Sequence, residues 1–135
     1  MNEVISLFGD NAGKVWQVLH ELGPLSEADL QEKTHLAESQ LCAAVGWLAR
    51  ENKIRKENGT YILGETNLIT LIGKDAGKIW RALDIWGEID AQSLSHLSRI
   101  TEHEVFTAVG WLVREGKVDG TINNINEEKI LFWLK

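Results

Sequence analysis

The sequence repeats itself at a constant spacing of 64 residues. Residues 12–16 read AGKVW and residues 76–80 read AGKIW, while residues 46–51 (GWLARE) return at residues 110–115 as GWLVRE. A fixed spacing kept by two separate blocks means that one structural unit has been duplicated whole. The chain is therefore restricted to folds with two similar units in tandem.

The two units have no obvious linker between them. No stretch rich in Pro, Ser or Gly separates the copies, and the candidate joint is Gly64-Glu65-Thr66-Asn67. Each copy has about 65 residues, a size at which isolated domains are only marginally stable. Six tryptophans can bury large apolar areas. We predict domains at residues 1–66 and 67–135 that pack against each other.

The first part of each copy has helical periodicity. Apolar residues over 12–22 follow the i, i+3, i+4, i+7 spacing of an amphipathic helix. The expected N-caps of this helix and its copy are Asp10 or Asn11 and Asp75. The preceding segments, residues 4–9 and 68–73, also match each other and are compatible with either a strand or an extra helical turn.

Two more helices and a hairpin are predicted next. Ser26-Glu27-Ala28-Asp29 resembles a capping box and starts a short helix through Lys33. A third helix starts near Ala37, and Asn58-Gly59 between β-prone runs is a strong hairpin signal. The second copy ends in strands at residues 117–122 and 129–134 around a loop at 123–128. The predicted fold class is α+β, mostly helical, with two tandem winged helix-turn-helix units of three helices and a β-hairpin wing each.

The two repeated blocks also carry a family resemblance. The AGK[VI]W opening and the GWLxRExK[IV] stretch before the wing resemble a family of small prokaryotic winged helix-turn-helix domains of unknown function. The resemblance covers each copy nearly end to end, and this chain differs from the single-domain form in being a tandem. It implies the fold, with DNA binding as an expectation from the fold, and it implies no catalytic residues and no ligand.

Enzymatic sites are not indicated. Residues 9–14 and 73–78 echo a phosphate-binding loop, which needs four residues between its glycines and a Ser or Thr after its lysine. Three residues separate the glycines here, and Val15 and Ile79 follow the lysines. We interpret both segments as helix starts whose glycine permits close packing. The histidines lack metal-site spacing, and no catalytic constellation recurs in both copies. We predict no enzyme, no cofactor and no metal.

Composition favours a cytoplasmic protein. The single cysteine, Cys42, cannot form an internal disulfide, which suits a reducing compartment. It matches Phe106 of the other copy, and we interpret it as a small buried hydrophobe. The start of the chain lacks signal-peptide features, and no apolar run reaches the ~18 residues that span a bilayer. We expect no membrane contact and either a monomer or a homodimer.

The third helix of each copy would be the recognition helix in a DNA-binding protein. The face predicted to point away from the core carries Ser39, Ala43, Gly46 and Arg50 in the first copy, and His103, Thr107, Gly110 and Arg114 in the second. Base readout favours Arg, Lys, Asn or Gln near the N-terminal end of this helix. The first copy offers Ser39 and Gln40, and glutamates flank His103 in the second. Direct readout is therefore predicted to be poor.

Two features of this region have alternative interpretations. A glycine inside a helix costs roughly 1 kcal/mol, so Gly46 and Gly110 either form a groove for another helix or backbone, or make room for the neighbouring Trp47 and its copy. We favour the second interpretation slightly. The basic cluster formed by Arg50, Lys53, Arg55 and Lys56 either grips a phosphate backbone or is a solvated hairpin edge. Both remain open, since Asp119 replaces Arg55 in the second copy.

Two functions survive. The first, preferred narrowly, is a double-stranded-DNA-associated transcriptional regulator whose tandem heads mimic a two-fold dimer. The second is a protein-interaction adaptor that binds through its acidic surface and the third helices, which a net charge of −6 favours. The predicted nucleic-acid contacts are Ser39, Gln40, Arg50, Lys53, Arg55, Lys56, His103, Thr107, Arg114 and Lys117. The copies share mainly what we interpret as scaffold, and their divergent exposed faces predict different partners.

Overall fold

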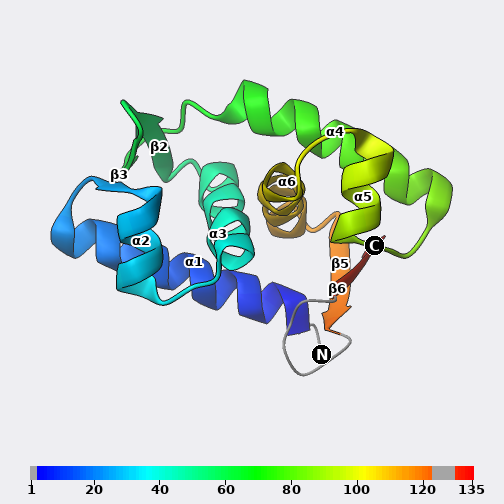
Figure 1. The fold of residues 1–135 in the computed structure, drawn as a ribbon, viewed down its shortest axis with the longest axis horizontal. Helices are drawn as coiled ribbons and strands as arrows, with labels where there is room; N and C mark the ends of the chain where they lie inside the picture. The colour runs from blue at the N-terminus through cyan, green and yellow to red at the C-terminus, as the bar shows by residue number, and fades with distance from the viewer. Residues whose placement is uncertain (1–2, 123–129) are drawn as a thin grey trace.

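The computed structural model describes residues 3–122 and 130–135 and contains two similar units (Figure 1). The first unit comprises α1 (Glu3–Leu22), β1 (Leu25–Ser26), α2 (Glu27–Thr34), α3 (Glu38–Arg50), β2 (Ile54–Glu57) and β3 (Thr60–Leu63). The second comprises α4 (Ile69–Trp86), β4 (Ile89–Asp90), α5 (Ala91–Ser98), α6 (Glu102–Arg114), β5 (Val118–Ile122) and β6 (Ile130–Leu134). The predicted winged helix-turn-helix fold is confirmed. The loop expected at 123–128 lies outside the described residues.

Local signals set most of the element boundaries. The Ser26 hydroxyl accepts a hydrogen bond from the backbone N–H of Asp29 at 3.2 Å and caps α2. Asn58 and Gly59 have φ angles of 51° and 78°, as a type I′ hairpin turn requires. Each sheet also has a short third strand that the sequence did not predict, giving the antiparallel orders β1-β3-β2 and β4-β6-β5.

The first helix of each unit is longer than expected. α1 and α4 continue through the segments at 4–9 and 69–73, which settles their assignment as helix. The predicted caps at Asp10, Asn11 and Asp75 are therefore wrong. Asn11 and Asp75 instead lie inside the helices and are buried, at 2% and 8% exposure. The apolar residues before them extend the buried stripe, so the helix gains packing by starting earlier.

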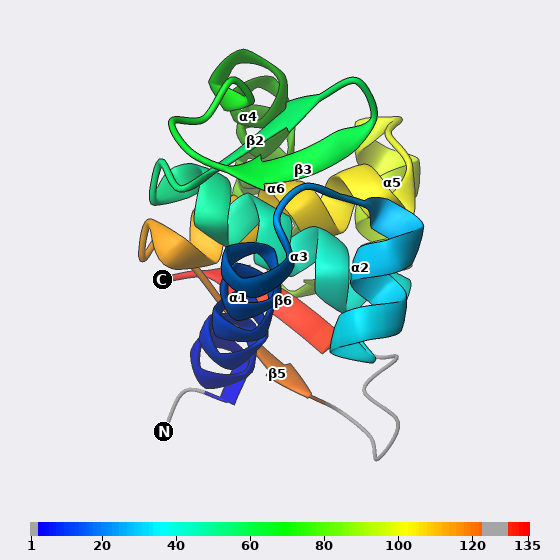
Figure 2. The ribbon, with the colours of Figure 1, turned by 90° about the vertical axis from the view of Figure 1, so that its left-hand side faces the viewer.

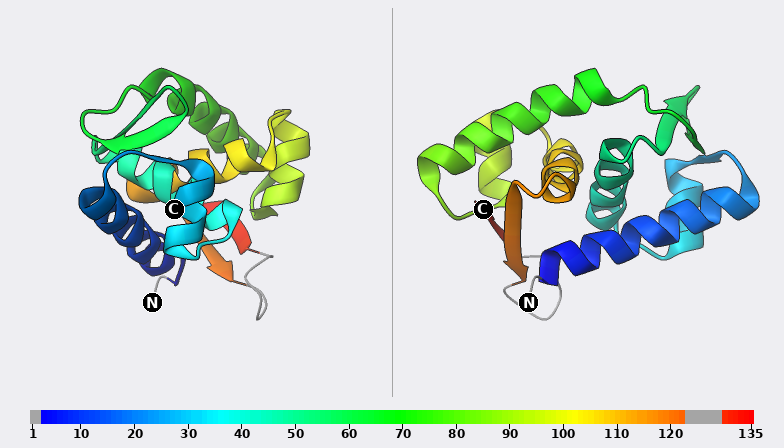
Figure 3. Two further views of the ribbon diagram at one scale, coloured as in Figure 1. Left: turned by 60° about the vertical axis from the view of Figure 1, so that its left-hand side comes forward. Right: turned by 180° about the vertical axis from the view of Figure 1, so that it is seen from behind.

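The extended starts of these helices pack on the opposite unit. Val4 and Phe8 of α1 belong to the hydrophobic core of the second unit. At the matching positions of α4, Ile72 is buried in the core of the first unit and Leu68 packs against it. The two long helices run along opposite sides of the molecule, as Figure 1 and the right-hand view of Figure 3 show. Each unit thus completes the core of the other.

The two third helices form the centre of the molecule. α3 and α6 lie side by side between α1 and α4 (Figure 1), and Figure 2 shows α3 behind α1 with the β2–β3 hairpin to one side. A contact between Glu38 and His103 joins their N-terminal ends, and an ion pair between Arg50 and Glu115 joins their C-terminal ends. The helices are therefore parallel, and an approximate two-fold axis runs along them. None of the described helices combines the length and apolar character that crossing a membrane requires.

Candidate functional site

The predicted recognition face of each third helix is covered by the other unit. A Cβ atom on Gly46 would overlap the backbone carbonyl of Thr107, with the carbonyl carbon at 2.9 Å. A Cβ atom on Gly110 would overlap the carbonyl of Ala43 in the same way, with the carbon at 2.8 Å. The preferred interpretation, that these glycines make room for the adjacent tryptophans, is wrong. The alternative of close approach by another helix is confirmed, and that helix is the third helix of the other copy.

The C-terminal ends of α3 and α6 are joined by reciprocal contacts. Arg50 pairs with Glu115 at 3.1 Å, and Arg114 pairs with Glu51 at 3.0 Å. Arg50 also lies over the ring of Trp111 at 5.7 Å, and Arg114 lies over Trp47 at 5.6 Å. Lys53 and Lys117 approach the same two glutamates, at 3.6 and 3.7 Å. The four predicted nucleic-acid-binding cations of this region therefore lie together, two around each carboxylate.

The predicted contacts at the N-terminal ends are also engaged. His103 pairs with Glu38 at 2.8 Å. The Thr107 hydroxyl donates to the His103 carbonyl at 3.0 Å, and the side-chain oxygen of Gln40 accepts from the N–H of Ala37 at 2.9 Å. Ser39 is half-buried in the same turn. These groups stabilise the helix ends and the contact between units, and a role in nucleic-acid binding stays a prediction.

The first wing holds the remaining two predicted cations. Arg55 pairs with Glu57 at 2.7 Å and donates to the carbonyl of Glu65 at 3.1 Å. The Lys56 ammonium lies over the Tyr61 ring at 5.1 Å. Arg55 and Lys56 therefore already have partners within the chain, which weakens their case as phosphate ligands without testing it.

The structure reveals a pair of equivalent surface clefts beside the C-terminal ends of α3 and α6. The first has a volume of about 290 Å³ and is lined by Gly9, Ala12, Gly13, Trp16, Trp47, Leu48, Glu51 and Lys53. The second has a volume of about 400 Å³ and is lined by Gly73, Ala76, Gly77, Trp80, Arg81, Trp111, Leu112, Glu115 and Lys117. Apart from Arg81, each residue of the second cleft repeats a residue of the first at the same spacing. The repeated blocks of the sequence are the walls of these clefts.

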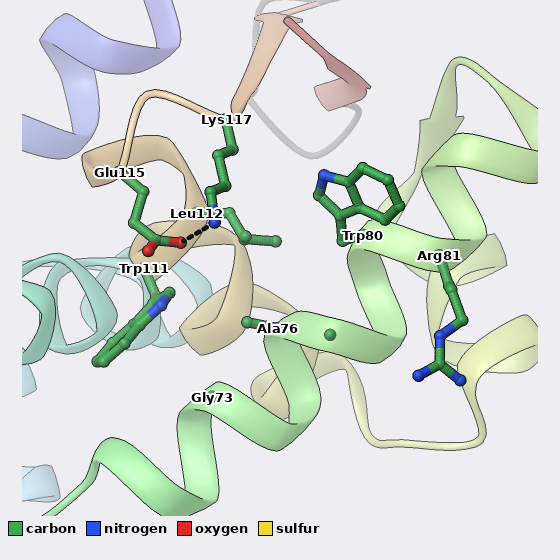
Figure 4. Close-up of a pocket in the computed structure, with 9 residues that line it drawn as sticks. Gly73, Ala76, Trp80, Arg81, Trp111, Leu112, Glu115 and Lys117 are labelled. Atoms are coloured by element: carbon green, nitrogen blue, oxygen red, sulfur yellow. Dashed lines mark ion pairs between the residues drawn. The ribbon is translucent and has the colours of Figure 1, made fainter.

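Aromatic side walls and a small-residue helix surface shape each cleft. Figure 4 shows the second cleft, with Trp80 of α4 and Trp111 of α6 on opposite sides and the α4 backbone at Gly73 and Ala76 along one edge. Trp80 is 41% exposed. Arg81 points away from Trp111 (Figure 4). Trp80 therefore offers exposed aromatic surface to a bound group, while Arg50 covers part of the Trp111 ring and, in the first cleft, His20 stacks on Trp16 and Arg114 lies over Trp47.

The glycines inside the clefts are not required by packing. A Cβ atom on Gly13 or Gly77 would meet nothing within 4 Å. Both glycines lie inside long helices, where each costs roughly 1 kcal/mol relative to alanine. The interpretation that these segments start helices is therefore wrong. Close packing within the chain explains Gly9, where a Cβ atom would lie 3.3 Å from the Trp47 ring, but it does not explain Gly13 or Gly77. Two copies that differ widely elsewhere thus keep a costly glycine at an open position, where packing within the chain does not account for it.

Each cleft has a lysine in its lining and an exposed arginine of the other unit beside it. Lys53 and Glu51 line the first cleft. Arg114, outside the lining, shares Glu51 with Lys53, and the side chains of the two cations are 52% and 44% exposed, against 18% for the carboxylate. Arg50 has the same relation to Lys117 and Glu115 of the second cleft, whose lining also includes Arg81. An anionic group in either cleft would therefore meet a lysine of the lining, next to the arginine that lies over the cleft tryptophan.

The sequence contained the signal for these clefts, but our interpretation of the shared blocks as scaffold was incomplete. Ala12 and Leu48 are buried and do form part of the core. Gly13 and Lys53 are exposed, and their identity in both copies has no explanation in packing. The residues that point to a binding site are those that are both identical in the two copies and exposed. The sequence shows the identity, but only the fold shows the exposure.

The comparisons with known proteins agree with this architecture. No curated protein and no solved structure matches the chain. The family model described as Winged helix-turn-helix domain (DUF2582) matches it twice, over residues 1–63 and 65–132. The chain therefore belongs to the winged helix-turn-helix domain family DUF2582, with two of its domains in tandem.

Proposed function

We propose that the protein is a non-enzymatic interaction adaptor that binds segments of partner proteins in its two equivalent clefts. The observation that carries the proposal is the repetition of the cleft walls in both copies, including the open helical glycines at 13 and 77. A role confined to folding would not require those glycines. The sequence predicts different partners for the two copies. Because the clefts have the same walls, we infer instead that both bind the same kind of segment.

The chemistry of the clefts selects the segment. Tryptophan faces favour an aromatic or aliphatic side chain, and aromatic anchors in pockets dominate many protein interfaces. The exposed lysine of each cleft, and the exposed arginine beside it, favour neighbouring carboxylates. We therefore infer an acidic peptide segment with one large apolar side chain, which would sit between Trp16 and Trp47 or between Trp80 and Trp111.

DNA association is the second candidate, and membership of a winged helix-turn-helix family favours it. Paired recognition helices normally read half-sites about 34 Å apart. Because α3 and α6 touch through Gly46 and Gly110, they cannot reach two such sites. The original preference for a regulator that mimics a two-fold dimer is therefore not supported by this geometry. The form of DNA binding that this geometry still allows is contact between DNA phosphates and the lysines and arginines at the clefts.

Peptide titration of glycine variants tests the adaptor. The probe is a fluorescent peptide with a single tryptophan flanked by glutamates, and we expect two sites on the unaltered protein. Gly13→Ala should leave one site and Gly13→Ala with Gly77→Ala should leave none, because each methyl group prevents the peptide from approaching the helix surface closely at that position. Ser6→Ala, on an exposed position of α1, is the matched control and should keep both sites.

The variants are chosen so that lost binding cannot be attributed to unfolding. Replacing a helical glycine by alanine at an open position should raise the free energy of unfolding by roughly 1 kcal/mol. Two sites in the double variant would contradict the proposal. Random duplex DNA is titrated in parallel at two salt concentrations, and binding that weakens steeply with salt and disappears in Lys53→Ala would support the second candidate instead.

A further inference from the structure

A third cavity lies at the opposite end of the central helix pair. It has a volume of about 210 Å³ and lies between the first wing, α3 and the helices α4 and α6 of the second unit. Its apolar walls include Val45, Leu71 and Ile72, and its polar lining includes Tyr61 and Asp75. Both units contribute to it, so a bound molecule would bridge them.

Divergence between the copies explains why this cavity is open. In the core of the second unit the positions that match Ile72, Cys42 and Tyr61 of the first core are occupied by Phe8, Phe106 and Phe132, with Phe8 contributed by α1. Phe132 contacts both of the other rings, at centroid distances of 6.5 and 6.2 Å. Three phenylalanines thus fill the space that the smaller cysteine and isoleucine leave open in the first unit. The cavity follows from specific substitutions at the N-terminal end of the helix pair.

Asp75 is the unusual group in this cavity. It is 8% exposed, and within residues 3–122 and 130–135 its carboxylate has no hydrogen bond and no ion pair. The matching residue of the first helix is the neutral Asn11. The carboxylate oxygens of Asp75 are not fully enclosed, so the unfavourable effect is a partial loss of hydration. Burial, and then the nearby Glu104, raise the pKa of Asp75, while Lys78 and Lys74 oppose the shift.

The other charged groups around the cavity add to the negative character of its lining. Glu27 and Glu104 line it together with Asp75. Of the basic side chains in the lining, Lys56 lies over the Tyr61 ring, and His103 contacts Glu38 outside the cavity. The lining thus has three carboxylates and one ammonium group, with Lys74 and Lys78 acting on Asp75 from outside it, and this balance favours a positively charged guest.

We propose that this cavity binds a small organic cation, a protonated amine attached to an apolar body of about one aromatic ring. An apolar cavity of roughly 150 Å³ accommodates benzene, so the observed volume suits a ring with a short amine arm. The ring packs against Val45, Leu71 and Ile72, and the ammonium donates to Asp75. This site is separate from the two clefts, and its failure would leave the adaptor proposal untouched.

Binding of phenethylamine tests the proposal and is measured by calorimetry and by NMR chemical shifts. Phenethyl alcohol is the neutral control of matching shape, and hydrocinnamate is the anionic one. We expect the amine to bind and the other two to bind at least about tenfold more weakly, since a charge-assisted hydrogen bond distinguishes them. Asp75→Asn should weaken the amine about tenfold and leave the alcohol unchanged. The fold should tolerate this variant, because Asn11 occupies the matching position.

Cys42→Phe tests the cavity itself, because it introduces the ring that fills the other unit. It should abolish binding of all three probes, while Cys42→Ala, which keeps the space and removes the thiol, should retain the amine. The proposal is overturned if no probe binds, if the alcohol binds as well as the amine, or if Asp75→Asn leaves the affinity for the amine unchanged. Amine binding that persists in a folded Cys42→Phe protein would also overturn it.

Discussion

The two ends of the central helix pair differ in what the duplication has kept. At the C-terminal ends of α3 and α6, both copies have the same tryptophans, glycines and charged residues, which line two equivalent clefts. At the N-terminal ends the copies have diverged, so that one site is filled by phenylalanines and the other is an open cavity. Because both units belong to one chain, the C-terminal end of the helix pair can keep identical residues while the N-terminal end acquires different ones. In a homodimer every substitution would occur in both subunits, so the two copies of a site could not differ in this way.

The largest effect is expected from adding a methyl group at the contact on which both ends depend. Gly46→Ala forces a Cβ atom against the Thr107 carbonyl, where backbone must move. We expect a loss of about 3 kcal/mol in the free energy of unfolding, at the upper end for overpacked cores. Chemical denaturation monitored by circular dichroism measures it.

Gly110→Ala is the symmetric partner of this variant and should lose a similar amount, because it meets the Ala43 carbonyl in the same way. Gly13→Ala, at an open position, is the control and should gain stability. Equal stability for Gly46→Ala and Gly13→Ala would mean that α3 and α6 do not touch as described.

Exchanging side chains between the two diverged sites should have the next largest effect. Phe106→Cys removes a ring that packs edge-to-face on Phe132 at 6.2 Å. Phe106 is partly buried, so we expect a loss of about 2 kcal/mol, below the range for fully buried rings. The reverse change, Cys42→Phe, fills existing space and should change the free energy of unfolding by less than about 1 kcal/mol. Losses of equal size would contradict the asymmetry between the two sites.

At the C-terminal ends of α3 and α6, where the two units are symmetric, we predict small losses of stability of equal size. Arg50→Ala removes the ion pair with Glu115 and the contact with Trp111, and Arg114→Ala removes the matching pair with Glu51. Both guanidinium groups are nearly half-exposed, so each variant should lose only about 0.5–1 kcal/mol. Thermal unfolding at low and at high salt measures both. A several-fold difference between the two variants would show that the two-fold relation fails at this end.

The sequence predicted those parts of the fold that depend on neighbouring residues. The Asn58-Gly59 turn and the Ser26 cap need only their own segments, and both are found as expected. The helix starts were placed too late, because the residues that extend α1, Val4 and Phe8, are stabilised by the opposite unit. No local signal could report that contact.

The candidate sites depended even more on the arrangement of the units. Gly46 and Gly110 stood out in the sequence, but whether they faced a helix or a tryptophan required the packing of α3 on α6. Apart from Arg81, the residues that line the clefts can be found in the sequence, because they are identical in the two copies. The sequence does not show which of them are exposed, and exposure distinguishes a binding surface from a core. Asp75 was predicted as a helix cap, and only its burial identifies it as a candidate ligand-binding group.

The smallest expected effect concerns Asp75 and its dependence on pH. Because burial and Glu104 raise the pKa of this carboxyl above 3.8, the folded protein keeps the proton to higher pH than the unfolded chain. The contribution of this group to stability is therefore fully present below pH 3.8 and declines as pH rises through the folded-state value.

Asp75→Asn cannot ionise, so it should match the unaltered protein in acid and become more stable than it at neutral pH. Denaturation series at acidic and neutral pH measure the difference. Asn11→Ala is the comparison at the matching neutral position, and its effect should not change with pH, since no group titrates there. A stability gain of Asp75→Asn that is the same in acid and at neutral pH would show that the buried carboxylate carries no charge cost. In that case Asp75 would give the open cavity no preference for a cation.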